Sequence, residues 1–168
     1  MPRLLSNRSV VVQPVRNGLG LVARRSLAPG ALVFRVGGRT LTSAALWRLW
    51  KTAPRKAANS YRCGEDLYAL APGTVADYAN HSCRPNSAVF MERGRLAVRA
   101  VRAIQAGQEV THDYATLLGA DDVWTMRCNC GERGCRKMVR RFDRLPPATL
   151  RRYMRAGWIP AFILQTAG

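Results

Sequence analysis

NHSCRPN, at residues 80–86, and CNCGERGC, at residues 128–135, are the most informative stretches of this 168-residue sequence. They contain four of its five cysteines, and three of these lie within eight residues of one another. The first stretch is a polar loop of the kind that carries functional side chains, and the second is a compact group of metal-ligand side chains. Together they predict that a metal is bound close to a functional loop.

The spacing of the cysteines indicates a shared metal ion. In an extended segment residues i and i+2 point to the same side, so Cys128 and Cys130 can present two thiolates to one ion. Two glycines in the same stretch allow tight turns that bring Cys135 back to this point. A structural zinc takes four tetrahedral ligands, and we expect Cys83, from the other motif, to be the fourth, with Cys63 left over.

The other interpretation of the cysteines is a set of free thiols or a disulfide pair. The first residues contain no apolar region of ~7–15 residues followed by a small-residue cleavage site, so we expect no secretory signal. A cytoplasmic chain, or one associated with a nucleoid or a nucleus, keeps its thiols reduced, which favours the metal. No run approaches ~18 apolar residues, so we also expect no membrane span.

The charge of the sequence is strongly positive, because 27 lysines and arginines face 10 acidic residues, which gives +17. Between Arg127 and Arg155, ten basic residues face only Glu132 and Asp143. Such a surface attracts polyanions or acidic proteins, and a nucleic-acid association through the basic C-terminal region is one interpretation. A solvated arginine-rich surface without a partner is the other, because no nucleic-acid motif with interleaved aromatic residues is present.

The pattern of apolar residues predicts one mainly β domain with short helices. Turn signals at Asn17-Gly18 and Arg93-Gly94 separate the short segments that form its strands. We expect strands at residues 9–13, 20–24, 31–36, 87–91, 95–100 and 109–114, and a small hairpin at residues 61–70. We expect helices at residues 42–51 and 147–156, a helical turn at residues 74–80 and a polar linker at residues 51–60.

Two further motifs, Gly18-Leu19-Gly20 and GQEVTHDY at residues 107–114, complete a set of four. In this order they resemble the SET-domain family of protein-lysine methyltransferases with a post-SET zinc motif, and the compact length is similar to that of bacterial members. The resemblance covers about residues 8–138 and implies a β fold with a C-terminal pseudoknot that brings the main motifs side by side. We expect a SET domain at residues 8–120, a post-SET zinc-binding segment at residues 124–139 and a basic helical C-terminal extension at residues 140–168.

The resemblance implies S-adenosyl-L-methionine as the methyl donor. In the family a glycine turn, here Gly18-Leu19-Gly20, lets the backbone approach the donor's methionine moiety. Asn80 is expected to bind the donor through its side chain, and His81 through its backbone. Met138 or Val139 is expected to pack against the donor's adenine or to make an ordinary core contact.

The resemblance also implies the catalytic side chains. Tyr114 matches the family's catalytic tyrosine, whose hydroxyl meets the lysine amine and the donor methyl. Tyr61 matches a second tyrosine of the lysine channel, although a core tyrosine fits the sequence nearly as well. His112 stands where the family usually has Tyr or Phe, a position that influences how many methyl groups are added. Since the charge of an imidazole changes near neutral pH, we expect pH-sensitive activity.

The sequence therefore predicts an S-adenosyl-L-methionine-dependent protein-lysine N-methyltransferase with one structural zinc, acting on a protein that presents a lysine. A histone or a histone-like, DNA-associated protein is one class of substrate, although a surface at +17 attracts a bare basic tail poorly. The alternative is a catalytically idle SET-like module that binds a protein or a nucleic acid through its basic surface.

Overall fold

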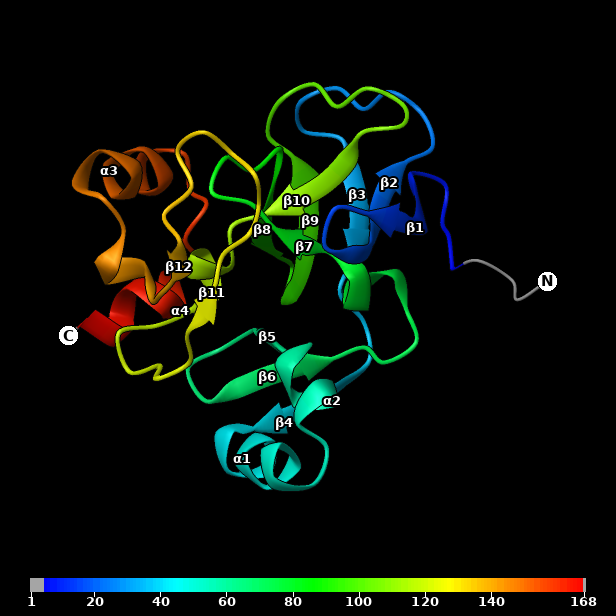
Figure 1. The fold of residues 1–168 in the computed structure, drawn as a ribbon. Helices are drawn as coiled ribbons and strands as arrows, with labels where there is room; N and C mark the ends of the chain where they lie inside the picture. Colours follow the sequence, from blue (N-terminus) through cyan, green and yellow to red (C-terminus); the bar gives the residue numbers. More distant parts are fainter. Residues whose placement is uncertain (1–4, 168) are drawn as a thin grey trace.

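A computed structural model describes residues 5–167 of the chain, and it is mainly β with short helices, as the sequence predicts (Figure 1). The strands form several small sheets rather than one large one. The first sheet has the order β1-β2-β10-β7, with β1 at Val10–Val15, β2 at Gly18–Ala23, β10 at Glu109–His112 and β7 at Asn80–His81. The second has the order β3-β9-β8, with β3 at Leu32–Arg35, β9 at Arg95–Ala100 and β8 at Ser87–Glu92.

Two predicted hairpins are confirmed, and their turns explain the register. β1 pairs antiparallel with β2 from Val15↔Gly18 outward, and β8 pairs with β9 from Glu92↔Arg95 outward. Arg93 and Gly94 between them both have positive φ, at 50° and 76°, which is the backbone of a two-residue turn that follows the twist of the strands.

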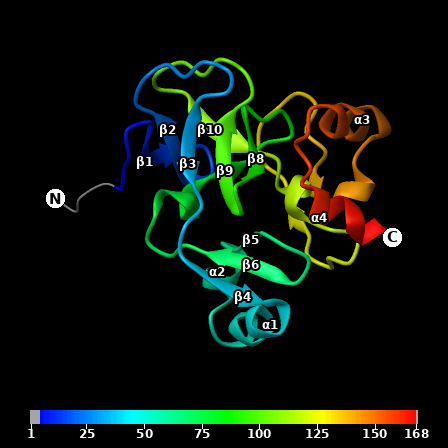
Figure 2. The same cartoon turned by 180° about the vertical axis from the view of Figure 1, so that it is seen from behind.

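A separate lobe is inserted between β3 and β8 and lies below the two sheets in Figures 1 and 2. Its sheet has the order β4-β6-β5, with β4 at Arg39–Thr42, β6 at Leu67–Leu70 and β5 at Tyr61–Arg62. Helix α1, Ser43–Thr52, is capped by the Thr42 hydroxyl, which accepts from the Ala45 N–H at 3.3 Å. The predicted linker at residues 51–60 is wrong in part, because Pro54 begins a second helix, α2, at Pro54–Ala58.

The C-terminal segment packs beside the first sheet and has a core of its own (Figure 2). It contains the two-stranded sheet of β11, Met126–Arg127, and β12, Met138–Val139, followed by α3, Pro147–Arg155, and α4, Ala161–Leu164. The predicted helix at residues 147–156 is confirmed, and Gly157, with φ +67°, follows its end. Single-turn helices complete the fold: η1 at Val75–Tyr78, η2 at Tyr114–Leu117, η3 at Phe142–Arg144 and η4 at Gln165–Ala167.

The feature that positions the site is the parallel pairing of β7 with β10. It sets Asn80 opposite Thr111 and His81 opposite His112, so the motif at residues 80–86 lies directly beside the motif at residues 107–114. This is the juxtaposition that the expected pseudoknot requires, while the threading of the chain itself stays a prediction.

Candidate active site and metal centre

The glycine turn, Asn80 and β10 meet at one end of the first sheet. The Asn80 side-chain Nδ2 donates to the Leu19 carbonyl at 3.1 Å and to the Glu109 carboxylate at 2.8 Å. A Cβ added at Gly20 would lie 2.7 Å from Asn80 Nδ2 and 2.6 Å from Glu109 Oε1, so no other residue fits there without movement. Leu19 is half exposed, which leaves the turn open to solvent on its outer side.

Tyr114 is fixed by hydrogen bonds from both its side chain and its backbone. Its hydroxyl donates to the Ala79 carbonyl at 2.9 Å, and its backbone N–H donates to Nδ1 of His81 at 3.2 Å. Because the hydroxyl proton is already used, the phenol oxygen can only accept from a further group. Burial raises the pKa of Tyr114, so the phenol stays protonated at neutral pH.

A cavity of about 500 Å³ opens between the inserted lobe and the segment that follows η2. Tyr61, His112 and Tyr114, the three predicted catalytic residues, all line it. The ring centroid of His112 lies 5.0 Å from that of Tyr114 and 5.8 Å from that of Tyr61. The Tyr61 hydroxyl donates a hydrogen bond to the Ala76 carbonyl at 2.7 Å. Trp47, Trp50 and Trp124 add aromatic surface to the walls. The cavity therefore has an apolar wall and a small polar floor.

The predicted donor-binding residues do not line this cavity. Gly18-Leu19-Gly20, Asn80, His81 and Met138 all lie outside its lining, whereas Tyr114 belongs to it and also contacts His81 through its backbone. Met138 is half-buried and pairs with Arg127 in the β11–β12 ladder. Tyr114 is thus the point where the cavity meets the other group of predicted residues.

The cavity contains an acidic group that the sequence interpretation missed. Asp77, Asp121 and Asp122 line it, and among the described lining residues Arg62 is the only basic one. The buried Arg62 guanidinium binds Asp121 at 2.6 Å and Asp122 at 3.2 Å, which ties β5 to the segment after η2. Burial raises the pKa of Asp77 and Asp122, whereas the hydrogen bond from Arg62 lowers that of Asp121. The adjacent aspartates Asp121 and Asp122 are visible in the sequence, but nothing in the sequence indicates that they lie in the same cavity as Tyr114.

His112 is a neutral imidazole inside this cavity wall. Its side chain is only 2 % exposed, and Nδ1 is buried with no hydrogen-bond partner among residues 5–167. Burial, with a smaller contribution from nearby His81, lowers the pKa of His112 to about 4. The expectation that its charge changes near neutral pH is therefore wrong, because the protonated form is excluded well above that value.

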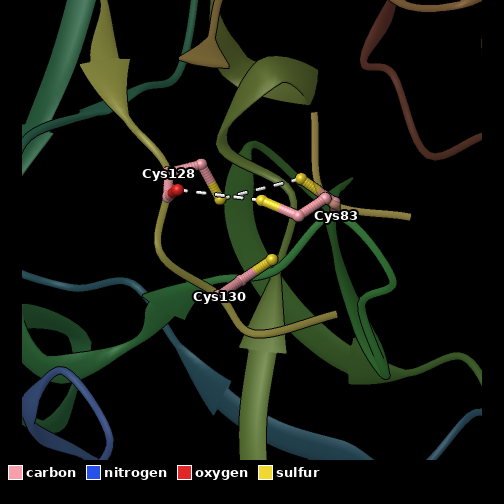
Figure 3. A group of neighbouring side chains, drawn as sticks. Cys83, Cys128 and Cys130 are labelled. Atoms are coloured by element: carbon pink, nitrogen blue, oxygen red, sulfur yellow. Dashed lines mark hydrogen bonds between the residues drawn. The ribbon is translucent and has the colours of Figure 1, made fainter. Parts of the chain in front are cut away.

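The four predicted metal ligands come together from separate segments of the chain, and Figure 3 shows three of them, Cys83, Cys128 and Cys130. The Sγ atoms of Cys83, Cys128, Cys130 and Cys135 all lie within 4.8 Å of one another, and those of Cys83 and Cys128 are 3.7 Å apart. Four thiolates at ~2.3 Å around a tetrahedral zinc have sulfur–sulfur separations of about 3.8 Å, so the donor set fits that metal. None of the five cysteines forms a disulfide, and Cys63 packs instead against the core of the first two sheets.

Backbone N–H groups support this thiol cluster. The Arg136 N–H points to Cys83 Sγ and the Lys137 N–H to Cys135 Sγ, each at 3.4 Å. The hydrogen bond from Lys137 lowers the pKa of Cys135 to about 7, while burial raises that of Cys83 to about 11. A bound cation is the group that would ionise the remaining thiols together.

His81 joins the thiol cluster to Tyr114. Its Nδ1 accepts from the Tyr114 N–H, so its proton is on Nε2, which lies 3.4 Å from Cys83 Sγ and donates to that sulfur. Burial lowers the pKa of His81 to about 4 and keeps the ring neutral. This side-chain role was missed from the sequence, which predicts only a backbone role for His81.

Comparison with known proteins identifies the family. The SET domain profile matches residues 18–115, which is more than half of the chain, and the chain belongs to the SET-domain family. The chain is 31 % identical over 139 residues to the histone-lysine N-methyltransferase ASHH3 of Arabidopsis thaliana, covering 77 % of this chain and 37 % of that protein. It is 30 % identical over 131 residues to the human histone-lysine N-methyltransferase 2B, covering 73 % of this chain and 5 % of that one.

A further relative is the H3 lysine-36-specific histone-lysine N-methyltransferase of Aspergillus fumigatus, which is 31 % identical over 135 residues. That alignment covers 74 % of this chain and 14 % of the relative. The chain thus spans less than two-fifths of the length of each of these relatives. Within residues 5–167 the helices are all too short to cross a membrane.

The buried neutral His112 predicts a specific dependence of stability on pH. Its pKa is about 4 in the folded protein and ~6.5 in the unfolded chain, so between these values the unfolded chain binds the proton and stability falls as the pH falls. Between pH 7 and pH 5 we expect the wild type to lose about 1–2 kcal/mol more unfolding free energy than His112→Phe, measured by urea denaturation. Equal losses in the two proteins would contradict a buried neutral imidazole.

Proposed function

We propose that this chain is an S-adenosyl-L-methionine-dependent protein-lysine N-methyltransferase. The observation that carries the proposal is the position of Tyr114, whose side chain lines the aromatic cavity while its backbone contacts the motif at residues 80–86. A lysine side chain entering through the cavity and a donor bound at the glycine turn would meet at this residue. The histone-lysine methyltransferases among the relatives support the same reaction class.

The residues proposed to hold the donor fit a cationic, amino-acid-like group. Gly18 has φ +101°, and an added Cβ there would meet nothing within 4 Å, so the turn leaves room for a ligand beside its backbone. The Glu109 carboxylate lies next to Asn80 and supplies negative charge at the same place. When bound, the donor supplies an electrophilic methyl group on a sulfonium.

The chain's own residues have to align an amine and exclude water. The Tyr114 oxygen, whose proton is used by Ala79, is left to accept from the amine or from the polarised methyl group. The Tyr61 hydroxyl likewise donates its proton to a backbone carbonyl, that of Ala76, so we propose that Tyr61 also contacts the lysine in the cavity. The His112 ring lies beside Tyr114 in the cavity wall, with ring centroids 5.0 Å apart, and so limits the room around the amine.

We further propose that the target lysine lies in a positively charged segment. Three of the ten acidic residues of the chain line the cavity against one arginine, Arg62, so the charged side chains of the lining remain negative in sum in a protein that carries +17 overall. Their field is local, because exposed charges are screened beyond ~8–10 Å in physiological salt. The basic surface elsewhere therefore does not prevent a lysine with cationic neighbours from entering here. A histone-like segment has this chemistry.

Methyl transfer to lysine peptides tests the proposed function directly. With S-adenosyl-L-methionine and a lysine peptide with arginine neighbours, we expect the wild type to add 14-Da increments detected by mass spectrometry. Tyr114→Phe should reduce the rate by about 10²-fold, because an oriented polar group at the reacting centre is lost. Wild-type protein that binds metal and peptide but transfers no methyl group would favour the idle binding module.

The number of methyl groups added tests the role of His112. We propose that the imidazole ring of His112, 5.0 Å from the Tyr114 ring in the cavity wall, restricts the room and polarity around the amine, so an apolar ring at this position should permit further transfers. His112→Phe is therefore expected to shift the products toward more highly methylated lysine, with His112→Tyr closer to the wild type. Identical product distributions in the three proteins would remove this role.

We propose that the thiol cluster holds one structural zinc. Four protein ligands leave no open coordination position, so the metal would hold the C-terminal segment against the motif at residues 80–86 rather than take part in chemistry. Cys128→Ser should lower the zinc content from about one to near zero atoms per chain by elemental analysis, and it should destabilise the fold. Cys63→Ser, the matched control, should keep its zinc. Full zinc retention in Cys128→Ser would contradict the site.

The basic C-terminal region supports a second, weaker association with nucleic acid. Seven exposed basic side chains of this region make no ion pair within the described chain: Arg127, Arg133, Lys137, Arg140, Arg151, Arg152 and Arg155. We expect binding to duplex DNA at low salt with a steep salt dependence, and the double variant Arg151→Gln/Arg155→Gln should reduce the slope by about two phosphate contacts. If no binding to duplex DNA is detected at low salt, the proposed nucleic-acid association is wrong and these side chains only contact solvent.

A further inference from the structure

Asp113, directly before Tyr114, is a buried carboxylate with an unusually complete set of partners. Its side chain is 1 % exposed. The Arg136 guanidinium binds it with two hydrogen bonds, both 2.7 Å, and the Tyr153 hydroxyl donates to Oδ2 at 3.0 Å. The Ala115 N–H donates to Oδ1 at 3.1 Å, so the carboxylate also caps η2. Such a charge is tolerated inside a protein only when its lone pairs are satisfied in this way.

The two side chains that donate hydrogen bonds to this carboxylate come from outside the residues that the SET profile matches. Arg136 follows the last cysteine of the cluster, and Tyr153 lies on α3, whereas the profile ends at residue 115. Tyr153 is completely buried, with its ring 4.9 Å from that of Trp158. A phenylalanine would fill the same space, so the replacement removes the hydroxyl's hydrogen bond to Asp113 while it keeps the ring in the core.

The residue on the other side of Tyr114 is also anchored to the C-terminal extension. Ala115 is fully buried in a core cluster with Phe142, Tyr153, Ile159 and Ile163. Both chain neighbours of Tyr114 are therefore fixed by residues beyond 140, one by a hydrogen bond and one by packing. A shift of α3 would move the backbone that carries the Tyr114 ring.

We infer that Tyr153 is a positioning residue for Tyr114, acting through the Asp113 carboxylate, and that residues 140–167 are part of the active-site scaffold and not a separate extension. The inference rests on the proposed function, because it takes Tyr114 as the catalytic tyrosine. Tyr153 touches neither the cavity nor the predicted donor residues, so its effect is on alignment and not on binding. Alignment of reacting atoms is sensitive to displacements of about 1 Å.

Tyr153→Phe tests this inference, with Trp158→Phe as the matched control. The control weakens packing in the same core but keeps the hydroxyl bond to Asp113. Rates are expressed per donor-binding site, counted by calorimetric titration with S-adenosyl-L-methionine, so that unfolded protein does not contribute. We expect Tyr153→Phe to lower kcat by about 10-fold with less than a twofold change in KM for peptide and donor, and Trp158→Phe to leave kcat per site unchanged.

A second readout does not depend on turnover. The Tyr114 backbone N–H donates to His81, so its amide ¹H–¹⁵N chemical shift reports its position. We expect the Tyr114 amide chemical shift to change in Tyr153→Phe. In Trp158→Phe its change should be no larger than the changes of other core amides. An unchanged kcat per site and an unmoved amide in Tyr153→Phe would overturn the inference. If the wild type has no turnover, the proposed function fails, and the amide shift alone decides whether Tyr153 positions Tyr114.

Discussion

The pairing of β7 with β10 is only two residues long, and the whole site depends on it. Two residues of parallel sheet supply few hydrogen bonds and do not persist without support from their surroundings. Three supports surround this pairing. The thiol cluster contacts the paired strands through the hydrogen bond between His81 and Cys83. Arg136 binds Asp113, directly after β10, and the C-terminal core packs against Ala115. Each support includes residues far from β7 in sequence, such as Cys128, Arg136 and Tyr153, which makes the site a product of the complete fold.

The distribution of charge separates two surfaces of one small protein. The cavity concentrates aspartates against aromatic walls, while the segment from Arg127 to Arg155 carries unpaired arginines on the outside. Because screening limits each field to its neighbourhood, a cationic segment at the cavity and a polyanion at the C-terminal region are compatible on the same molecule. Under the proposed function, a target that is itself associated with nucleic acid would contact both surfaces.

The sequence predicted those parts of the structure that are set by local rules. The helix expected at residues 42–51, the Arg93-Gly94 hairpin and the grouping of Cys128, Cys130 and Cys135 each follow from spacing and residue type, and each is present. It did not predict α2, because the polar composition of residues 51–60 indicates a linker, whereas Pro54 is the first residue of a helix. Nor did it predict the contacts of Asp122 and Tyr153, since these depend on tertiary packing between segments far apart in sequence. The environment of His112 was misjudged because burial is not visible in the residue type.

The central claim is that donor and lysine reach Tyr114 from two different groups of residues. Calorimetric titration of the metal-replete protein with S-adenosyl-L-methionine tests it most directly, using Asn80→Ala on the donor side and Asp122→Asn in the cavity. The account predicts one donor site in the wild type, a loss of at least about 10-fold in affinity for Asn80→Ala, and an unchanged affinity for Asp122→Asn. Absence of donor binding in the folded wild type, or equal weakening by both substitutions, would contradict it.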